Sequence, residues 1–264
     1  MERISSRRNP MVKRFRALAD GSNDYVLLDG AHLLEDALAC GVAVETVAVR
    51  DADTDGPFAD LVRKAADRGA RVLRVAETVL TAISPVRSPS GVVAIARRRP
   101  VPIEAALEHA PQLALVLADV QDPGNVGAIV RVADGCGATG VITGGRSADP
   151  FGWKALRGSM GSAFRIPVSA QPGLEPALHV ARARGIRALA AVPRDGVPLP
   201  QCDFRPATAV ILGGEGAGVP ESLLDLCDGR ITIPMRPQVE SLNVATAAAL
   251  ILYEALRQRE GPAS

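Results

Sequence analysis

The chain has 264 residues, of which 47% are hydrophobic and 22% are charged, and its net charge at pH 7 is +1. This composition is typical of globular proteins and excludes a disordered or fibrous chain. The length allows one large domain or two modest ones.

Cysteine usage and hydropathy further narrow the class of protein to which the chain can belong. The four cysteines form no Cys-x-x-Cys pair and the chain has three histidines, so we expect no metal site. The wide cysteine spacing and the lack of a signal-peptide pattern indicate a reducing, cytoplasmic setting. No apolar run approaches about 20 residues, so we expect no membrane span. The aromatic content of 3% argues against RNA binding by base stacking on an aromatic platform.

The N-terminal arm, residues 1–16, is strongly basic. It carries six Lys and Arg residues against Glu2 alone, a net charge of +5, which leaves −4 on the remainder of the chain. This distribution favours a polyanionic partner such as RNA, although a solvated helix explains the charge equally well. Asn9-Pro10 predicts where that helix begins. The arm residues predicted to bind RNA are Arg7, Arg8, Lys13 and Arg14.

The first half of the chain is predicted to alternate short strands and helices. An arginine- and proline-rich stretch, Arg97–Pro102, then interrupts regular structure. We place a linker at 98–111, between a domain at 1–97 and a second at 112–260. Its arginines either contact RNA or are solvated, and we favour solvation. The predicted strands are Tyr25–Leu28, Thr46–Val49, Val72–Val75 and Val92–Ala96, and the predicted helices are Ala31–Cys40 and Phe58–Arg68.

The second half restarts the alternation with strands that lack polar residues. Such strands, separated by helices, predict an α/β domain with a parallel sheet covered on both faces. The predicted strands are Leu113–Leu117, Gly140–Thr143, Arg165–Val168, Ile186–Ala191, Thr208–Leu212 and Arg230–Ile233. The predicted helices are Gly127–Asp134, Trp153–Met160, Leu174–Arg184, Pro220–Leu226 and Ser241–Arg259.

The segment Gly135–Gly140 matches the G-x-G-x-x-G pattern of dinucleotide-binding proteins. That fingerprint needs a strand before it and a helix after it. Here a helix ends and a strand begins, so we interpret the glycines as a helix C-cap and a tight turn. This order argues against a nucleotide-dependent oxidoreductase.

Three strand-end segments carry polar residues. In the first, 119–131, Asn125 and Arg131 follow a buried strand, where open α/β sheets place ligands. Taken singly, Asn125 is explained by helix capping and Arg131 by solvation. In the second, 211–219, four glycines surround Glu215, and such glycines let a ligand approach the backbone.

The third segment, 231–244, follows the last predicted strand. Ser241 stands where the N-cap of the last helix is expected, and capping alone explains it. Asn243 falls one turn into that helix among apolar residues. We therefore expect its amide to be buried and to need hydrogen-bonding partners.

Together these segments resemble the three signature motifs of the SpoU family of SPOUT methyltransferases, which are TrmH-like RNA 2′-O-ribose methyltransferases. The resemblance covers about 113–258. The family's invariant polar positions match Asn125, Arg131, Glu215, Ser241 and Asn243. The first half resembles the family's substrate-binding domain, which has a ribosomal-protein-like α/β/α fold. It does so at 4–13, 28–32 and 90–94, with Asp29 where the family more often has Glu.

The resemblance implies a deep trefoil knot in the C-terminal domain, a homodimer formed through that domain, and S-adenosylmethionine as methyl donor. In the family the knot forms the donor pocket, with backbone groups on the adenine edge and apolar side chains as a wall. The residues thereby assigned to donor binding are Leu212, Gly213, Gly214, Ile233, Met235 and Leu242.

The resemblance also implies roles for the polar residues. In the family the arginine matching Arg131 is proposed as the base, helped by an RNA phosphate. Because a guanidinium is essentially always protonated, we expect Arg131 to bind the phosphate and lower the pKa of the ribose hydroxyl, and its role in deprotonation stays open. Asn125 and Asn243 would orient Arg131 and the substrate. Ser241 would hydrogen-bond near the reacting centre, and Glu215 would hold either its own loop or Arg131.

Alternatives remain for the RNA that is methylated and for the class of protein. Ribosomal RNA, most of all 23S rRNA, is favoured by the additional N-terminal domain, but family members also modify tRNA or confer thiopeptide resistance through rRNA. An RNA-binding assembly factor without catalysis is the alternative of another class, although all five polar positions are intact. The last helix carries an apolar stripe that either forms the dimer interface or packs on its own sheet, namely Val244, Ala248, Leu252 and Leu256.

Overall fold

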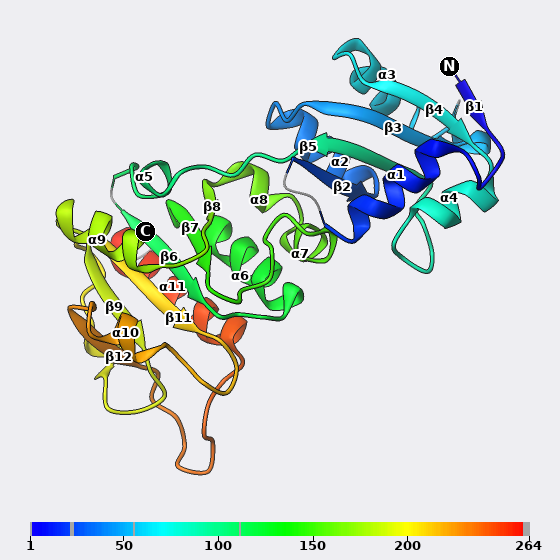
Figure 1. The fold of residues 1–264 in the computed structure, drawn as a ribbon. Helices are drawn as coiled ribbons and strands as arrows, with labels where there is room; N and C mark the ends of the chain where they lie inside the picture. The colour runs from blue at the N-terminus through cyan, green and yellow to red at the C-terminus, as the bar shows by residue number, and fades with distance from the viewer. Residues whose placement is uncertain (1, 22–23, 55, 111, 261–264) are drawn as a thin grey trace. The chain divides into compact units, whose positions relative to one another are not determined.

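The computed structural model describes residues 2–21, 24–54, 56–110 and 112–260. They form two compact units, each with its own sheet (Figure 1). The N-terminal unit comprises Met1–Arg99 with Phe151–Phe164, and the C-terminal unit comprises Pro100–Pro150 and Arg165–Ser264. The first boundary falls inside the predicted linker 98–111, of which residue 111 lies outside the described residues.

The segment Phe151–Phe164 groups with the N-terminal unit, whereas the sequence placed it in the C-terminal domain. Its Trp153 packs against the N-terminal core cluster that contains Phe15 and Leu80. Sequence order hid this association, because the segment lies between two strands of the C-terminal sheet. The segment contains α7 (Trp153–Ser159) and most of α8 (Ser162–Arg165).

The N-terminal sheet is mixed. Its order is β1-β4-β3-β5-β2, in which β1, β4 and β3 run parallel and β5 runs antiparallel to both of its neighbours. The strands are β1 (Glu2–Ile4), β2 (Tyr25–Asp29), β3 (Val44–Arg50), β4 (Arg71–Val75) and β5 (Val92–Arg97). The main helices are α1 (Pro10–Ala19), α2 (Ala31–Ala39), α3 (Ala59–Asp67) and α4 (Glu77–Ile83). The sequence analysis missed β1 and α4.

Helix α1 begins where the sequence predicted. Asn9 is its N-cap, and the Asn9 side chain accepts a hydrogen bond of 2.8 Å from the Met11 N–H. Pro10 takes the first helical position, where the missing N–H costs nothing. Val12 and Phe15 are buried on the inner face, so the basic residues of the helix are left on its other faces.

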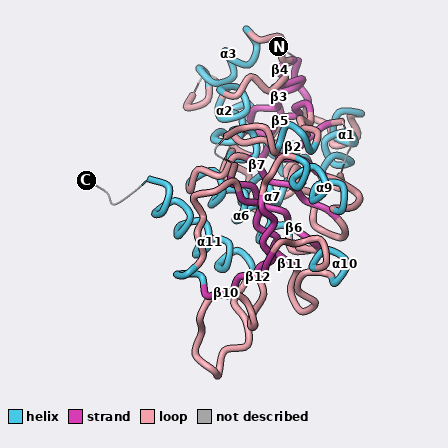
Figure 2. The backbone as a smooth tube through the Cα atoms, turned by 90° about the vertical axis from the view of Figure 1, so that its left-hand side faces the viewer, coloured by secondary structure: helices cyan, strands magenta, loops and turns pink. Residues whose placement is uncertain are grey.

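The C-terminal sheet is parallel throughout its described strands, as predicted. Its order is β10-β12-β9-β11-β6-β7-β8. Helices α6 and α11 lie on one side of it and α9 and α10 on the other (Figure 2). The strands are β6 (Leu113–Ala118), β7 (Gly140–Gly144), β8 (Val168–Ala170), β9 (Arg187–Ala191), β10 (Val197–Pro198), β11 (Thr208–Gly213) and β12 (Gly229–Thr232). The helices are α5 (Ile103–Ala106), α6 (Pro123–Gly135), α9 (Glu175–Ala183), α10 (Glu221–Leu224) and α11 (Val244–Glu260).

Two local predictions in this unit were wrong. The strand expected at Arg165–Val168 begins only at Val168, because Arg165 ends a helix and Pro167 has no N–H for the sheet ladder. The stretch after the arginines is not irregular throughout, since α5 forms there and buries Ile103 and Ala106. By contrast, the interpretation of 135–140 is confirmed: α6 ends at Gly135, Gly137 has a φ of 72°, and β7 begins at Gly140.

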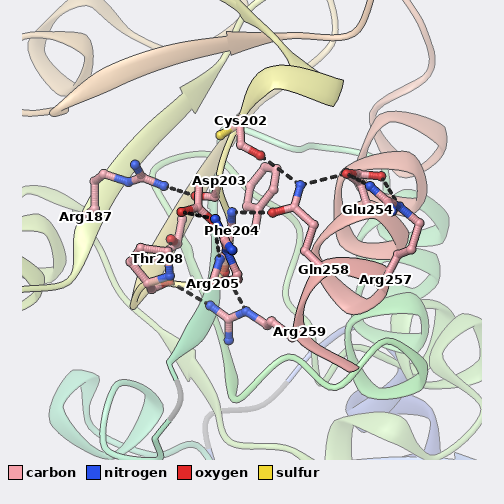
Figure 3. A network of polar contacts seen from close by, with 11 residues as sticks. Arg187, Cys202, Asp203, Phe204, Arg205, Thr208, Glu254, Arg257, Gln258 and Arg259 are labelled. Atoms are coloured by element: carbon pink, nitrogen blue, oxygen red, sulfur yellow. Dashed lines mark hydrogen bonds and ion pairs between the residues drawn. The ribbon is translucent and has the colours of Figure 1, made fainter. Parts of the chain in front are cut away.

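The last turn of α11 is hydrogen-bonded to the segment that leads into β11 (Figure 3). The Gln258 amide donates to the Cys202 carbonyl and accepts from the Phe204 N–H, each at 2.8 Å. Arg259 donates to the Phe204 carbonyl at 2.7 Å and also to the carbonyls of Gln112 and Pro206. These bonds anchor the C-terminal end of a helix whose N-terminal end reaches the candidate site.

Among the described residues, no helix has the length and apolarity to cross a membrane. In the same part of the chain, no three His, Cys, Asp or Glu side chains gather into a group able to hold a metal ion.

Candidate active site

A cavity of about 710 Å³ lies in the C-terminal unit, at the carboxyl ends of β9, β11 and β12. In open α/β sheets this edge is the usual ligand site. The six residues predicted to bind the donor all line the cavity, namely Leu212, Gly213, Gly214, Ile233, Met235 and Leu242. Glu215, Ser241 and Asn243 also line it.

The glycine loop after β11 is held by backbone contacts. The Gly214 N–H donates to the Ala118 carbonyl at 2.8 Å, and the Gly218 N–H donates to the Gly214 carbonyl at 3.1 Å. A Cβ on Gly213 would overlap the backbone of Gly218, and one on Gly214 would overlap the Asp119 carbonyl. These two glycines are therefore required by the chain's own packing, whereas the sequence analysis attributed them to ligand approach.

The other two glycines of this loop are needed for a different reason, namely their backbone conformation. Gly216 and Gly218 have φ values of 92° and 69°, which side chains rarely adopt, and a Cβ on either would meet nothing within 4 Å. They allow the turn and leave the space beside it open. Between them the four glycines make a compact loop that presents backbone groups to the cavity.

The segment between β12 and α11 forms a long loop, drawn in orange in Figure 1. Ile233, Met235 and Leu242 are each half-buried and contribute apolar surface to the cavity. Ser241 is exposed and lies in this loop, three residues before α11 begins at Val244. The prediction of Ser241 as N-cap was therefore wrong.

Side chains from the three motif segments meet in one hydrogen-bonded group. The Asn125 Nδ2 donates to the Glu215 carboxylate. The Asn243 Nδ2 donates to the Asn125 Oδ1 at 3.1 Å, while its own Oδ1 accepts from the N–H groups of Ala245 and Thr246. Both ends of the Asn125 amide thus have a partner, and the three segments are tied together through it.

This group changes two predictions. Asn243 is exposed and caps the first turn of α11, so it is neither buried nor one turn into the helix. Asn125 does not cap α6; Asp122 does, by accepting a 2.8 Å hydrogen bond from the Asn125 N–H. The Asn125 side chain is thereby released for Glu215, which explains why a carboxylate stands among the glycines.

Arg131 lies two turns into α6 and is exposed. It is not among the residues that line the cavity. Within the described part of the chain it makes no hydrogen bond or ion pair, so Glu215 does not hold it. A guanidinium with five unused donors at the surface is suited to bind an external phosphate.

Family models match both halves of the chain. The model of the SpoU rRNA methylase family matches residues 112–253. The chain belongs to this family. A second model, for RNA 2′-O ribose methyltransferase substrate binding, matches residues 27–102. The predicted SpoU membership and methyltransferase class are confirmed.

Individual SpoU relatives cover nearly the whole chain. The 23S rRNA (guanosine(2553)-2′-O)-methyltransferase RlmP of Bacillus subtilis is 33% identical over 96% of this chain and 98% of its own. An AdoMet-bound rRNA methyltransferase structure from Sinorhizobium meliloti has a TM-score of 0.87 at 31% identity and covers 97% of both chains. The structure of AviRb from Streptomyces viridochromogenes with AdoMet has a TM-score of 0.85 at 28% identity, covering 96% of this chain and 99% of that one.

The predicted RNA-binding residues of this SpoU chain lie in the N-terminal unit. Arg7, Arg8 and Lys13 are exposed, and the Arg7 Nε donates to the Thr78 carbonyl at 3.0 Å. Arg14 differs, because its guanidinium forms a two-bond ion pair with Glu45 and lies 5.1 Å from the ring centre of Tyr25. The hydrogen bond from Arg14 lowers the pKa of Glu45 below its ordinary value, so this charge is already neutralised within the protein.

Sequence reasoning missed three acidic residues at the site. Glu221 and Glu240 line the cavity. Asp119 lies beneath the glycine loop with a φ of 59°, a strained conformation for a residue other than glycine. Its carboxylate accepts a 2.6 Å hydrogen bond from the Arg146 N–H. For Asp119 and Glu221 the available signal was position, since they come one residue after β6 and three residues after Gly218; Glu240 stands eight residues after β12, so its position did not single it out.

Proposed function

We propose that this protein transfers a methyl group from S-adenosylmethionine to a ribose 2′-hydroxyl of ribosomal RNA, with 23S rRNA as the target. The observation that carries the proposal is the group formed by Asn125, Glu215 and Asn243 at the rim of the cavity. It joins the three motif segments at the carboxyl edge of the parallel sheet. The relative RlmP is named for the same reaction on 23S rRNA.

The cavity fits the donor. Its volume of about 710 Å³ lies within the roughly 300–1,000 Å³ typical of small-molecule sites. Leu212, Ile233 and Leu242 offer an apolar wall, and the glycine loop offers backbone groups for a polar edge. The two neighbouring structures described with AdoMet support this donor. When bound, it supplies a methyl group already activated by its sulfonium.

The remaining chemistry is to position the hydroxyl and to remove its proton. We assign Arg131 to an RNA phosphate beside the target ribose, where its charge lowers the pKa of the hydroxyl. Asn125, Glu215 and Asn243 act as positioning residues, because their contacts are with one another and with the start of α11. We assign Ser241, which is exposed in the loop that lines the cavity, to a hydrogen bond near the reacting centre.

RNA binding is assigned to the N-terminal arm. Arg7, Arg8 and Lys13 are exposed cations, and the N-terminal unit contains the match to the substrate-binding model. We retain the division into an RNA-binding domain at 1–97 and a methyltransferase domain at 112–260, with a deep knot in the second. We expect the protein to act in the cytoplasm.

We also propose a homodimer formed through the C-terminal domain. The apolar stripe first considered for it is part of the core, since Val244, Ala248 and Leu252 are buried within the chain. Leu250 and Tyr253 are the candidates instead, because they are 44% and 65% exposed on the same helix. Light scattering should give twice the 27.5 kDa chain mass. Leu250→Glu with Tyr253→Glu should lower it to the mass of one chain, and a monomeric unmutated protein would contradict the dimer.

The test of function combines a donor titration with a methyl-transfer assay on isolated ribosomal RNAs and tRNAs. We expect donor binding and incorporation of methyl groups into 23S rRNA. Mapping 2′-O-methylated nucleotides in RNA from a strain that lacks the gene should show one missing site. Incorporation of methyl groups into tRNA instead would show that tRNA is the target. Donor binding without transfer to any RNA would favour the assembly factor.

A further inference from the structure

The ionisable side chains that line the cavity are all acidic. They are Glu215, Glu221 and Glu240, and no Lys, Arg or His is among the lining residues. The chain as a whole has nearly equal numbers of both signs, with 30 Lys and Arg against 29 Asp and Glu. The one-sided charge is therefore a property of the cavity rather than of the protein.

Within the described residues, none of these three carboxylates forms an ion pair with a Lys, Arg or His side chain. The hydrogen-bonding partner of Glu215 is the neutral amide of Asn125. Glu221 stands in the first turn of α10, and Glu240 stands in the loop before α11. In the described part of the chain, neither Glu221 nor Glu240 forms a hydrogen bond or ion pair through its side chain. All three residues are exposed, so their field acts on a ligand with solvent screening.

We propose that the acidic cavity selects its ligand by charge and binds the methylated, cationic donor more tightly than the demethylated product. The inference rests on the proposed function. In that reaction the bond from carbon to sulfur breaks, a bond from carbon to the ribose oxygen forms, and the hydroxyl proton is lost to solvent. The sulfonium thereby becomes a neutral thioether. The donor carries a sulfonium, an ammonium and a carboxylate, and the product has lost the first of these.

The consequence is exchange of product for donor after each turnover. Apart from the methyl group, the two ligands have the same shape, so the apolar wall and the backbone contacts bind both. A field from carboxylates distinguishes them, because it acts on the one charge by which they differ. For exposed carboxylates screened by solvent, the expected preference is about fivefold at low salt.

Calorimetry on the intact protein, without RNA, tests this directly. The probes are S-adenosylmethionine, S-adenosylhomocysteine and sinefungin, which carries an ammonium group in place of the methylated sulfonium. We expect the two cationic ligands to bind about fivefold more tightly than the thioether at about 50 mM salt, and the preference to shrink at about 500 mM. Equal affinities at low salt would overturn the inference.

Variants identify the source of the preference. Glu221→Gln with Glu240→Gln removes two charges from the cavity without changing side-chain size. Glu104→Gln with Glu175→Gln removes two exposed charges that do not line it, and serves as the matched control. The cavity variant should lose most of the preference by weakening donor binding, with affinity for the thioether unchanged. The control should keep the preference.

The outcomes separate this inference from the proposed function. If neither S-adenosylmethionine nor S-adenosylhomocysteine binds the unmutated protein, the proposed function fails. If both bind with one affinity, the methyltransferase stands and the selection by charge is wrong. Equal weakening of both ligands in the cavity variant would also overturn the inference, because it would show that the glutamates support the pocket's shape.

Discussion

The two sheets of this protein differ in the direction of their strands. In the C-terminal sheet all described strands are parallel, so the loops after β6, β9, β11 and β12 emerge at one edge. In the N-terminal sheet β5 runs against β2 and β3, so strand ends fall at both edges. The first arrangement brings distant segments together in one cavity. The second does not, and its candidate RNA-binding residues all lie in the N-terminal arm, partly before α1 and partly in its first turns.

This difference predicts how each region should respond to mutation. In the cavity the functional segments contact one another, through Asn125 and through the backbone at Gly214. In the arm, Arg7, Arg8 and Lys13 are exposed, and within the described residues no hydrogen bond or ion pair joins their side chains to one another. We therefore expect coupled, large effects in the C-terminal unit and additive, small ones in the N-terminal unit.

The largest effect is expected at Gly214. In Gly214→Val the new side chain would overlap the Asp119 carbonyl, so the loop cannot keep its position. We expect donor binding to be lost and the free energy of unfolding to fall by more than about 3 kcal/mol. Calorimetry and thermal unfolding measure the two. Gly216→Ala, which has free space but a φ of 92°, should lose about 1–2 kcal/mol. Equal losses would remove the distinction between the two glycines.

Arg131 should show the largest effect on turnover without an effect on folding. It is exposed and does not line the cavity. Arg131→Ala should reduce kcat by about 100-fold or more, with donor affinity and Tm unchanged. Arg131→Lys should not restore activity well, because lysine lacks the planar fork that binds phosphate in two places. Near-normal turnover in Arg131→Ala would show it to be an ordinary surface residue.

Coupling within the cavity can be tested at Asn125 and Glu215. Asn125→Asp places two carboxylates against each other where a hydrogen bond now exists. We expect methyl transfer to fall about tenfold or more. Adding Glu215→Gln supplies a donor again and should recover part of that loss in the same assay. If the double variant is as poor as the product of the two single losses, the residues act independently.

The arm should respond additively. Replacing Arg7, Arg8 and Lys13 with Ala should weaken RNA binding and flatten the dependence of log affinity on log salt by up to about 0.9 per lost phosphate contact. Donor affinity should not change. Arg14→Ala is the contrast, since its charge is paired with Glu45; it should cost about 0–1 kcal/mol of stability and leave the salt dependence nearly unchanged. A triple variant with normal RNA affinity and normal salt dependence would show that the arm is only a solvated helix.

The smallest effect concerns Asp29 in the N-terminal sheet. Burial raises the pKa of its carboxyl, and this outweighs the opposing hydrogen bond from Ser84 and the charge of Arg157. The folded protein therefore holds this proton more tightly than the unfolded chain. Stability should fall as pH rises from about 4 through the folded pKa, by no more than about 1 kcal/mol. Asp29→Asn should remove this part of the pH dependence of urea unfolding, and an unchanged profile would contradict it.

The sheet type of the C-terminal unit, the positions of most strands, the start of α1 and the family could all be predicted from the sequence. These depend on local patterns: apolar runs without alternation, caps such as Asn9-Pro10, and motif residues at set spacings. The resemblance to the SpoU family, carried by those motif residues, implied Leu212, Ile233 and Leu242 for donor binding, and all three line the cavity.

Features that depend on distant contacts could be found only in the tertiary structure. It placed Phe151–Phe164 with the N-terminal unit through Trp153, and it made Asn243 the cap of α11 and the partner of Asn125. It also showed that Gly214 is required by the Asp119 carbonyl rather than by a ligand. No local pattern encodes these facts, because a hydrogen bond between residues 118 positions apart, or an overlap between two loops, exists only once the sheet has brought them together.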